Sequence, residues 1–233
     1  MGFFRKLWRA VKSVVRVVVK AIVGLVMRIV HILGEILTLG LVTKKLTIQV
    51  MILRDERSSP LIAEAAIQAA VTSTTTIFKD RFNVAVRMYG KPGVQTIDGP
   101  APTAALDDHC DIDAYAEDFG EAGEFYATHT AGWVGIPISL RFPVTVFVVR
   151  TVDGKIGCSI PITDYVTLSA TSSSGGVTGV TDPTTMAHEL AHTCLLPHRD
   201  NISNLLYPSA GRGTETTWWQ RRVARTSRHV TFW

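Results

Sequence analysis

The chain has 233 residues, of which 46% are hydrophobic, 19% are charged and 8% are aromatic. This length suits one domain with an additional segment, or two small domains, and the composition excludes a disordered chain, a collagen-like chain and a small disulfide-stapled protein. The formal net charge of +4 is unevenly distributed. Residues 1–45 carry nine basic residues and one acidic residue, a net charge of +8, so residues 46–233 carry a net charge of −4. Because the larger part is acidic and holds no recognition motif, we expect no nucleic-acid partner.

The basic N-terminal segment has helical periodicity. Five of its basic residues recur at intervals of three or four, so they form a narrow stripe on a helix whose remaining surface is largely valine. These residues are Arg5, Arg9, Lys12, Arg16 and Lys20. A basic stripe on a broad apolar helix is typical of helices that lie in the membrane interface and contact anionic headgroups. We therefore predict a long amphipathic N-terminal helix that binds a membrane surface, and a membrane-associated or cell-surface protein.

Two other interpretations of this segment remain open. The helix could dock on another protein in an assembly, or Ala21–Val42 could span a membrane if its polar residues faced a partner. Arg28, His31 and Glu35 interrupt the apolar stretch, so no uninterrupted run reaches the ~18–20 residues that a spanning helix needs. A cleavable signal peptide is not indicated, because Arg28 lies within the apolar stretch and no small-residue cleavage site follows.

Residues 46–233 alternate between strand and helix patterns, which predicts an α+β domain. β-Branched stretches predict strands, and an alanine-rich stretch predicts a helix. In chain order we expect a strand at Leu46–Leu53, a helix at Leu61–Phe82, and strands at Val84–Tyr89, Phe142–Val152 and Asp164–Ser169. Ala170–Val180 is rich in Ser, Gly and Thr and is expected to be a loop. Asp107–Glu124 holds eight acidic residues without Lys or Arg, which we interpret as a solvated loop, with a cation site as the alternative.

A metal-binding pattern follows the loop that is expected at Ala170–Val180. The sequence from His188 to His192 is HExxH, and Asp182 followed by Pro183 is typical of the start of a helix. Two histidines four residues apart point to the same side of a helix and can share one zinc ion, with Glu189 beside them. The sequence therefore predicts a helix that carries two ligands of a zinc site.

A third ligand has to come from outside that helix. His198, six residues after His192, can return to the metal if the helix ends near Leu195 or Leu196 and the chain turns sharply, which Pro197 favours. Asp200 is an alternative third ligand.

The match extends to a longer pattern. HExxHxxGxxH is satisfied except that Leu195 stands at the glycine position, and Asn-Leu-Leu-Tyr-Pro follows at residues 204–208. Over residues 182–208 the chain resembles the metzincin zinc proteases. The spacing is nearest to their matrixin branch, in which a turn with a methionine beneath the metal ends Leu-Met-Tyr-Pro, so Leu206 stands in the place of that methionine.

This resemblance implies a fold and an arrangement of the site. The implied fold is a metzincin-like mixed twisted β-sheet with a zinc-binding active-site helix and a closing C-terminal helix. The implied zinc ligands are His188, His192 and His198, the implied general base is Glu189, and the implied supporting turn is Leu206, Tyr207 and Pro208. An antiparallel edge strand at Gly157–Ser159 or Asp164–Ser169 would bind an extended peptide.

Four further expectations concern residues around the site. Leu195 either accepts the left-handed conformation that the glycine normally adopts, at a cost of roughly 1–2 kcal/mol, or takes a different turn. Cys110, Cys158 and Cys194 allow one disulfide, most plausibly with Cys158. Trp218 and Trp219 are expected in the core, and a solvated or partner-facing side is expected for the arginines of the last helix, Arg221, Arg222, Arg225 and Arg228. Residues 211–213 are expected to be flexible.

The function that these features favour is that of a zinc-dependent endopeptidase. A glutamate general base and a zinc-bound water would hydrolyse a peptide or protein substrate, and residues 1–45 would tether the domain of residues 46–233. The alternative is a catalytically weak or inactive protein of the same fold, which acts as a binding or assembly component with the helix as a docking or membrane-active element.

Overall fold

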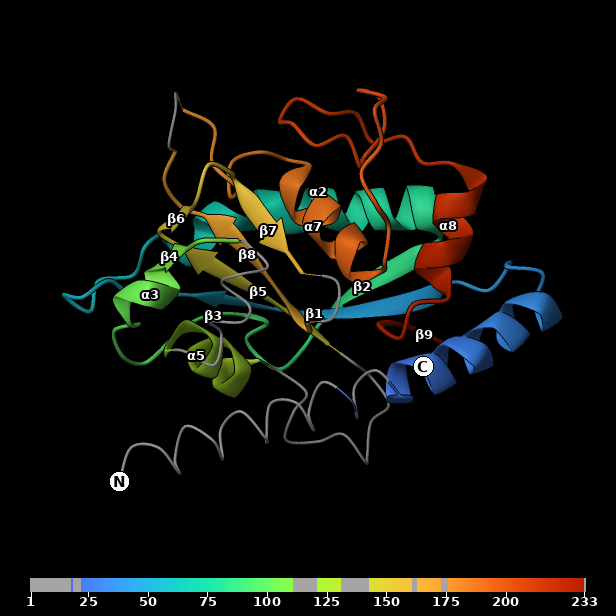
Figure 1. Cartoon of the computed structure of the whole chain (residues 1–233), viewed down its shortest axis with the longest axis horizontal. Coiled ribbons are helices and arrows are strands. Elements are labelled where there is room, and N and C mark those ends of the chain that lie inside the picture. Colours follow the sequence, from blue (N-terminus) through green and yellow to red (C-terminus); the bar gives the residue numbers. More distant parts are fainter. Residues whose placement is uncertain are drawn as a thin grey trace.

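The computed structural model describes residues 18, 22–110, 121–130, 143–160, 163–172 and 176–232. Across these ranges a seven-stranded sheet runs in the order β2-β1-β5-β8-β7, with β3 and β9 also paired to β1 (Figure 1). Its strands are β1 Lys44–Ile52, β2 Val84–Met88, β3 Val94–Thr96, β5 Val144–Val149, β7 Gly157–Ser159, β8 Tyr165–Ser169 and β9 Val230–Thr231. Most pairs are parallel, whereas β7 pairs antiparallel with β8 at one edge and β9 pairs antiparallel with β1.

Helices cover both faces of the sheet. One layer holds η1 Glu64–Ile67, α2 Gln68–Ile77, η2 Phe78–Phe82 and α7 Thr185–Thr193, and α3 Thr103–Leu106 and α5 Glu121–His129 belong to the other. The central strand β1 packs against both helix layers, because alternate residues of a strand point to opposite faces. Ile48 and Val50 pack with the α2 and α7 layer, while Met51 and Leu53 pack with α3 and α5. Burial on both faces explains the continuous apolar run in β1.

The predicted elements occur in the expected order in the described residues, but the helix expected at Leu61–Phe82 begins at Glu64 and divides into η1, α2 and η2. The sequence did not predict β3, α3, α5 and β9. Phe142–Val152 was expected to be a single strand, but β5 ends at Val149 and a separate β6, Thr151–Val152, pairs with β4, Asp107–Asp108. Arg150 separates the two strands because its guanidinium is bound by the carboxylates of Asp107 and Glu56. The prediction of a solvated loop is therefore wrong at both described ends of the acidic stretch, because Asp107–Asp108 form β4, with Asp107 bound to Arg150, and Glu121 and Glu124 belong to α5, Glu121–His129. Residues 111–120 of the stretch lie outside the described residues.

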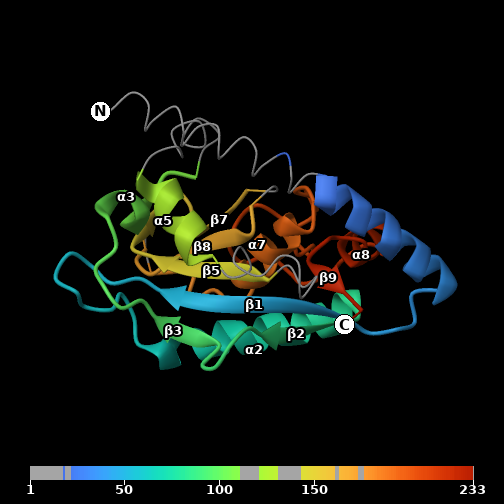
Figure 2. The ribbon, with the colours of Figure 1, turned by 90° about the horizontal axis from the view of Figure 1, so that it is seen from below.

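The N-terminal segment includes a helix at residues 22–37 that packs against the domain. In both views it lies beside α8, Trp218–Arg225, and β9 (Figure 1 and Figure 2). Within the described ranges, no helix is both long and apolar enough to cross a membrane. The predicted basic stripe from Arg5 to Lys20 lies outside the described residues.

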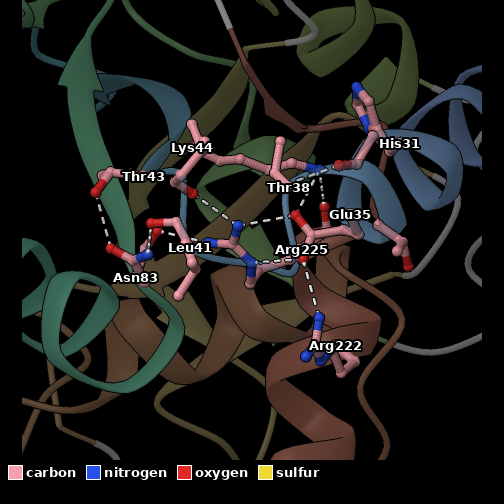
Figure 3. Close-up of polar contacts among 12 residues, drawn as sticks. His31, Glu35, Thr38, Leu41, Thr43, Lys44, Asn83, Arg222 and Arg225 are labelled. Atoms are coloured by element: carbon pink, nitrogen blue, oxygen red, sulfur yellow. Dashed lines mark hydrogen bonds and ion pairs between the residues drawn. The ribbon is translucent and has the colours of Figure 1, made fainter.

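Buried charges hold this helix to the domain (Figure 3). The Arg225 guanidinium donates from Nε and Nη2 to the two Glu35 oxygens at 2.9 and 2.8 Å, and Lys44 Nζ lies 3.2 Å from Glu35 Oε1. The Glu35 and Arg225 side chains are 5% and 1% exposed, and that of Lys44 is fully buried. On the same helix, His31 Nδ1 bonds the Ser227 carbonyl at 2.9 Å. Glu35 thus contacts the last helix and His31 the segment just after it, an arrangement that the sequence did not indicate.

Burial opposes the charged form of Glu35, but the hydrogen bond from Arg225 and the charge of Lys44 outweigh it, so the pKa of Glu35 is lowered. Burial, and then the Lys44 charge, lower the pKa of His31 to about 4. The structure therefore favours an ionised Glu35 and a neutral His31 at neutral pH.

Two expectations for the last helix are wrong. Trp218 and Trp219 are 71% and 45% exposed, because the buried side of α8 is formed by Gln220, Ala224 and Arg225. The start of α8 explains this orientation, since Thr217 caps the helix and forms a reciprocal capping box with Gln220. Arg225 is buried instead of solvated because Glu35, 190 residues away, neutralises it.

Candidate metal centre

Helix α7 is fixed at its start by a buried carboxylate. Asp182 Oδ1 accepts bonds from the Thr184 amide at 2.8 Å, the Thr184 hydroxyl at 2.7 Å and the Thr185 amide at 2.9 Å. These bonds satisfy amides that have no partner within the helix. Asp182 therefore supports the start of the helix, but the N-cap is Thr184 and not Asp182 as predicted, and the helix begins at Thr185.

Three imidazole rings lie close together on α7 and the segment after it. His188 and His192 come from the helix and His198 from the segment after it, and their Nε2 atoms lie 3.0, 3.1 and 3.3 Å apart. For a tetrahedral zinc ion with Zn–N bonds near 2.05 Å, ligand nitrogens are about 3.3 Å apart. The spacing thus fits three corners of a tetrahedron, and the three histidines form a group that could hold a metal ion. Asp200 is not a member of that group.

Backbone carbonyls orient two of these rings. His188 Nδ1 bonds the Leu205 carbonyl at 2.7 Å, and His192 Nδ1 bonds the Leu196 carbonyl at 2.6 Å. A carbonyl accepts only from a protonated Nδ1, which leaves the Nε2 lone pair available to a metal. Burial lowers the pKa of His188 to about 2 and that of His192 to about 4, and it also lowers the pKa of His198. Neutral imidazoles are the form that zinc requires, so the donor set fits the metal that the sequence predicts.

A sharp turn after α7 returns His198 to the other two histidines. Leu195 adopts φ +66°, and its amide bonds the His192 carbonyl at 2.8 Å while the Leu196 amide bonds the Ala191 carbonyl at 3.3 Å. These two bonds and the left-handed residue form a Schellman motif, which usually has glycine at this position. Of the two alternatives left open for Leu195, the structure therefore has the strained left-handed conformation.

The predicted supporting turn lies against the same helix. Leu206 is fully buried, and its amide bonds Asn204 Oδ1 at 2.9 Å. Asn204 is in turn paired through both amide groups with Gln220 of α8, at 3.0 and 3.1 Å. Because the Leu205 carbonyl bonds His188, this network links α8 to the histidines. Tyr207 is half-buried, and exposed Pro208 lines the cavity described below.

Glu189 sits between the histidines and the edge strand. Burial raises its pKa to about 8, against the charges of Arg212 and Lys155, which lower it. The strand approaches so closely that a Cβ atom at Gly157 would lie 2.8 Å from Glu189 Oε1. A glycine at this position of β7 is therefore what allows backbone to pass next to the carboxylate, a role that the sequence did not reveal.

A cavity of about 740 Å³ connects these groups. It is lined by the three histidines and Glu189, by β7 with the turn before it, and by the segments around Pro197 and Pro208. A disulfide between Cys110 and Cys158 also borders it, so Cys158 is paired as expected, while Cys194 is a buried free thiol. Burial raises the pKa of Cys194 to about 11.

Arg212 is a further cavity residue that sequence reasoning missed. It lies in the segment that was expected to be flexible, yet it is only 6% exposed. Its Nε donates to the Ser209 carbonyl at 2.9 Å. No sequence signal identified it, because the recognisable motif ends at Pro208.

Comparison with known proteins supports the fold. No protein-family model and no curated protein matches the sequence. Among solved structures, the chain is similar to metalloproteinase-II from Bacteroides fragilis, with a TM-score of 0.50 and 14% sequence identity. The match covers 80% of this chain and 55% of that chain, so this chain spans about half the length of the structure it matches. At this identity the likeness concerns the fold alone, which is metalloproteinase-like.

Proposed function

We propose that the chain is a zinc-dependent endopeptidase of the metzincin type. The observation that carries this proposal is the convergence of three neutral imidazole nitrogens at 3.0–3.3 Å beside a buried glutamate in a peptide-sized cavity. His188, His192 and His198 would hold the metal. When bound there, zinc would supply Lewis acidity and a water of lowered pKa.

The chain's own residues would do the remaining work. The outer edge of β7 pairs with no strand of the described sheet, so an extended peptide can add to it through backbone hydrogen bonds. Gly157 would bring that peptide close to Glu189. Glu189 would accept a proton from the attacking water and pass it to the leaving amine. Its pKa falls when a cation occupies the histidines, because an opposite charge favours the carboxylate.

Metal analysis combined with a peptide-library digest tests this function. We expect about one zinc per chain, cleavage that stops on chelation, and recovery on adding zinc. Glu189→Gln should retain zinc and lose cleavage, whereas His198→Ala should lose both. Glu64→Gln, a surface change, is the matched control. Zinc binding without cleavage of any library peptide would instead favour the binding or assembly role.

We further propose that residues 1–45 tether the domain to an anionic membrane surface. In the helix at residues 22–37, His31 and Glu35 face the domain, whereas most of the large apolar side chains face outward, the reverse of the usual arrangement in a soluble protein. The exposed residues include Leu25, Ile29, Leu33, Ile36 and Leu37, with Leu37 84% exposed. A continuous exposed apolar surface indicates a binding surface. The six basic residues of positions 1–20, with no acidic residue, complement anionic headgroups.

Vesicle co-sedimentation of the full chain tests the tether. Binding should be strong to vesicles with anionic lipid, weaker to neutral vesicles, and reduced by Leu33→Glu with Leu37→Glu, while cleavage of soluble peptides stays unchanged. Self-association or capture of one defined protein without vesicle binding would assign this surface to a protein assembly. The disulfide between Cys110 and Cys158 favours an oxidising compartment, so we propose the cell surface or exterior as the site of action.

A further inference from the structure

The cavity contains a buried cation that the proposed chemistry does not use. Arg212 is 6% exposed, and its Nη1 is buried with no hydrogen-bond partner among the described residues. Within the described residues, Arg212 forms no ion pair with a carboxylate. A buried charge without a counter-charge is costly, so such groups normally meet an anion.

The nearest acidic groups do not serve as that anion. Asp182 acts on Arg212 through its charge, but its Oδ1 already accepts three bonds from Thr184 and Thr185. Glu189 borders the same cavity and its charge also acts on Arg212, but among the described residues no hydrogen bond or ion pair joins the two. Arg212 lines the cavity, so an anion that enters it meets a guanidinium whose charge is not neutralised by an ion pair among the described residues.

The charge of the cavity also favours binding of an anionic ligand. Apart from Glu189, its charged lining residues are cations, Arg212 and Lys155. The wall next to Arg212 is formed by Pro208, Ser209 and Ala210, so it holds one neutral hydroxyl and no acidic group. This positive cavity contrasts with the net acidic segment of residues 46–233.

We infer that Arg212 is a specificity-determining residue that binds a carboxylate of the peptide substrate next to the bond to be cleaved. The planar guanidinium matches a carboxylate through paired hydrogen bonds, which distinguishes it from a neutral amide of the same shape. The carboxylate can come from an Asp or Glu side chain or from the C-terminus of a short peptide. This inference rests on the proposed function, and it adds the substrate class.

Matched peptide pairs test the inference. One pair differs by Glu against Gln beside the cleaved bond, and a second differs by a free against an amidated C-terminus. For wild type we expect kcat/KM to be about 10-fold or more higher for the acidic member of one pair, as a charge-assisted hydrogen bond allows. The pair that shows the preference identifies the source of the carboxylate. A ratio near one in both pairs overturns the inference without any variant.

Variants separate recognition from a structural role. Arg212→Gln should reduce the preference to about one, mainly through the acidic peptide, and leave the neutral peptide within a few-fold. Arg212→Lys should keep part of the preference, because it retains the charge and loses the paired geometry. Arg57→Gln removes an equal charge from an exposed site and should change nothing. If Arg212→Gln slows both members of a pair equally, Arg212 has only a structural role and the inference fails.

Binding to the zinc-free Glu189→Gln protein separates this inference from the proposed function. Fluorescence anisotropy of labelled peptides measures affinity without hydrolysis. Tighter binding of the acidic peptide that Arg212→Gln abolishes supports the carboxylate site even if no peptide is ever cleaved. Cleavage of library peptides without an acidic preference supports the endopeptidase and rejects the role of Arg212.

Discussion

Replacing Glu35 by Gln tests the buried charge cluster that joins the N-terminal helix to the domain. The substitution keeps the size of the side chain and removes its charge, which leaves the side chains of Lys44 and Arg225, at 0% and 1% exposure, without an acid. Removing one partner of a buried ion pair costs about 3–5 kcal/mol, because the remaining charge is buried without compensation. We expect a loss of this size, which is a large part of the 5–15 kcal/mol that is typical of a domain.

Two measurements follow the effect. Urea unfolding of the purified chain gives the global loss, and hydrogen exchange of the amides at residues 22–37 shows whether the helix separates before the domain unfolds. If only the helix separates, the global free energy of unfolding falls less, and hydrogen exchange becomes faster in this helix alone. In either case, adding Lys44→Met to Glu35→Gln should recover part of the loss, since it removes one uncompensated cation.

An exposed glutamate provides the control. Glu64→Gln changes the same functional group at the surface, and we expect a change within about 0.5 kcal/mol. If Glu35→Gln costs less than about 1 kcal/mol and leaves exchange at residues 22–37 unchanged, the cluster behaves as a surface pair and the reasoning from burial is refuted.

Three other predictions concern the turn, acid stability and metal. Leu195→Gly relieves a left-handed strain of about 1–2 kcal/mol against an entropic cost of about 0.5–1 kcal/mol. Urea unfolding should therefore show a net gain between zero and about 1.5 kcal/mol, and a loss above about 1 kcal/mol would contradict the strain. The pKa of His31 is about 4 in the fold and 6.5 in the unfolded chain, so up to about 3 kcal/mol of stability is lost as pH falls from 6.5 to 4. His31→Asn should flatten this dependence of stability on pH. An unchanged dependence would mean that other groups cause it. Zinc at 100 times its dissociation constant should add about 2.7 kcal/mol to the free energy of unfolding. The melting temperature should rise accordingly, and a chelator or His198→Ala should remove the rise. Equal melting temperatures with and without zinc would contradict a metal site.

The sequence was most informative where structure depends on short-range spacing. His188 and His192 share a helix side because they are four residues apart, and the turn to His198 could be foreseen from the length of the segment between them. The strands were predictable for a similar reason, since burial on both faces leaves a continuous apolar run such as that of β1. The glycine position offered a left-handed conformation at Leu195 as one of two alternatives, and the structure has it.

Features that depend on distant contacts could not be foreseen. Glu35 and Arg225 are 190 residues apart, and either residue alone is typical of a solvated surface. Trp218 appeared to be a core residue because aromatic side chains are usually buried, but the capping box at Thr217 turns it outward. Arg212 and Gly157 have no motif around them, and their roles come only from the cavity wall that the fold assembles.

The disulfide between Cys110 and Cys158 has a consequence for a protein that is proposed to cut peptide bonds. It closes a covalent loop across 48 positions of the chain, and this loop contains β5, a central strand of the sheet. A single cut anywhere between the two cysteines leaves both fragments joined, so the edge strand that carries Cys158 stays attached to the first half of the chain. Nicking by a protease, including another copy of this chain, would then reveal itself on a gel only after reduction.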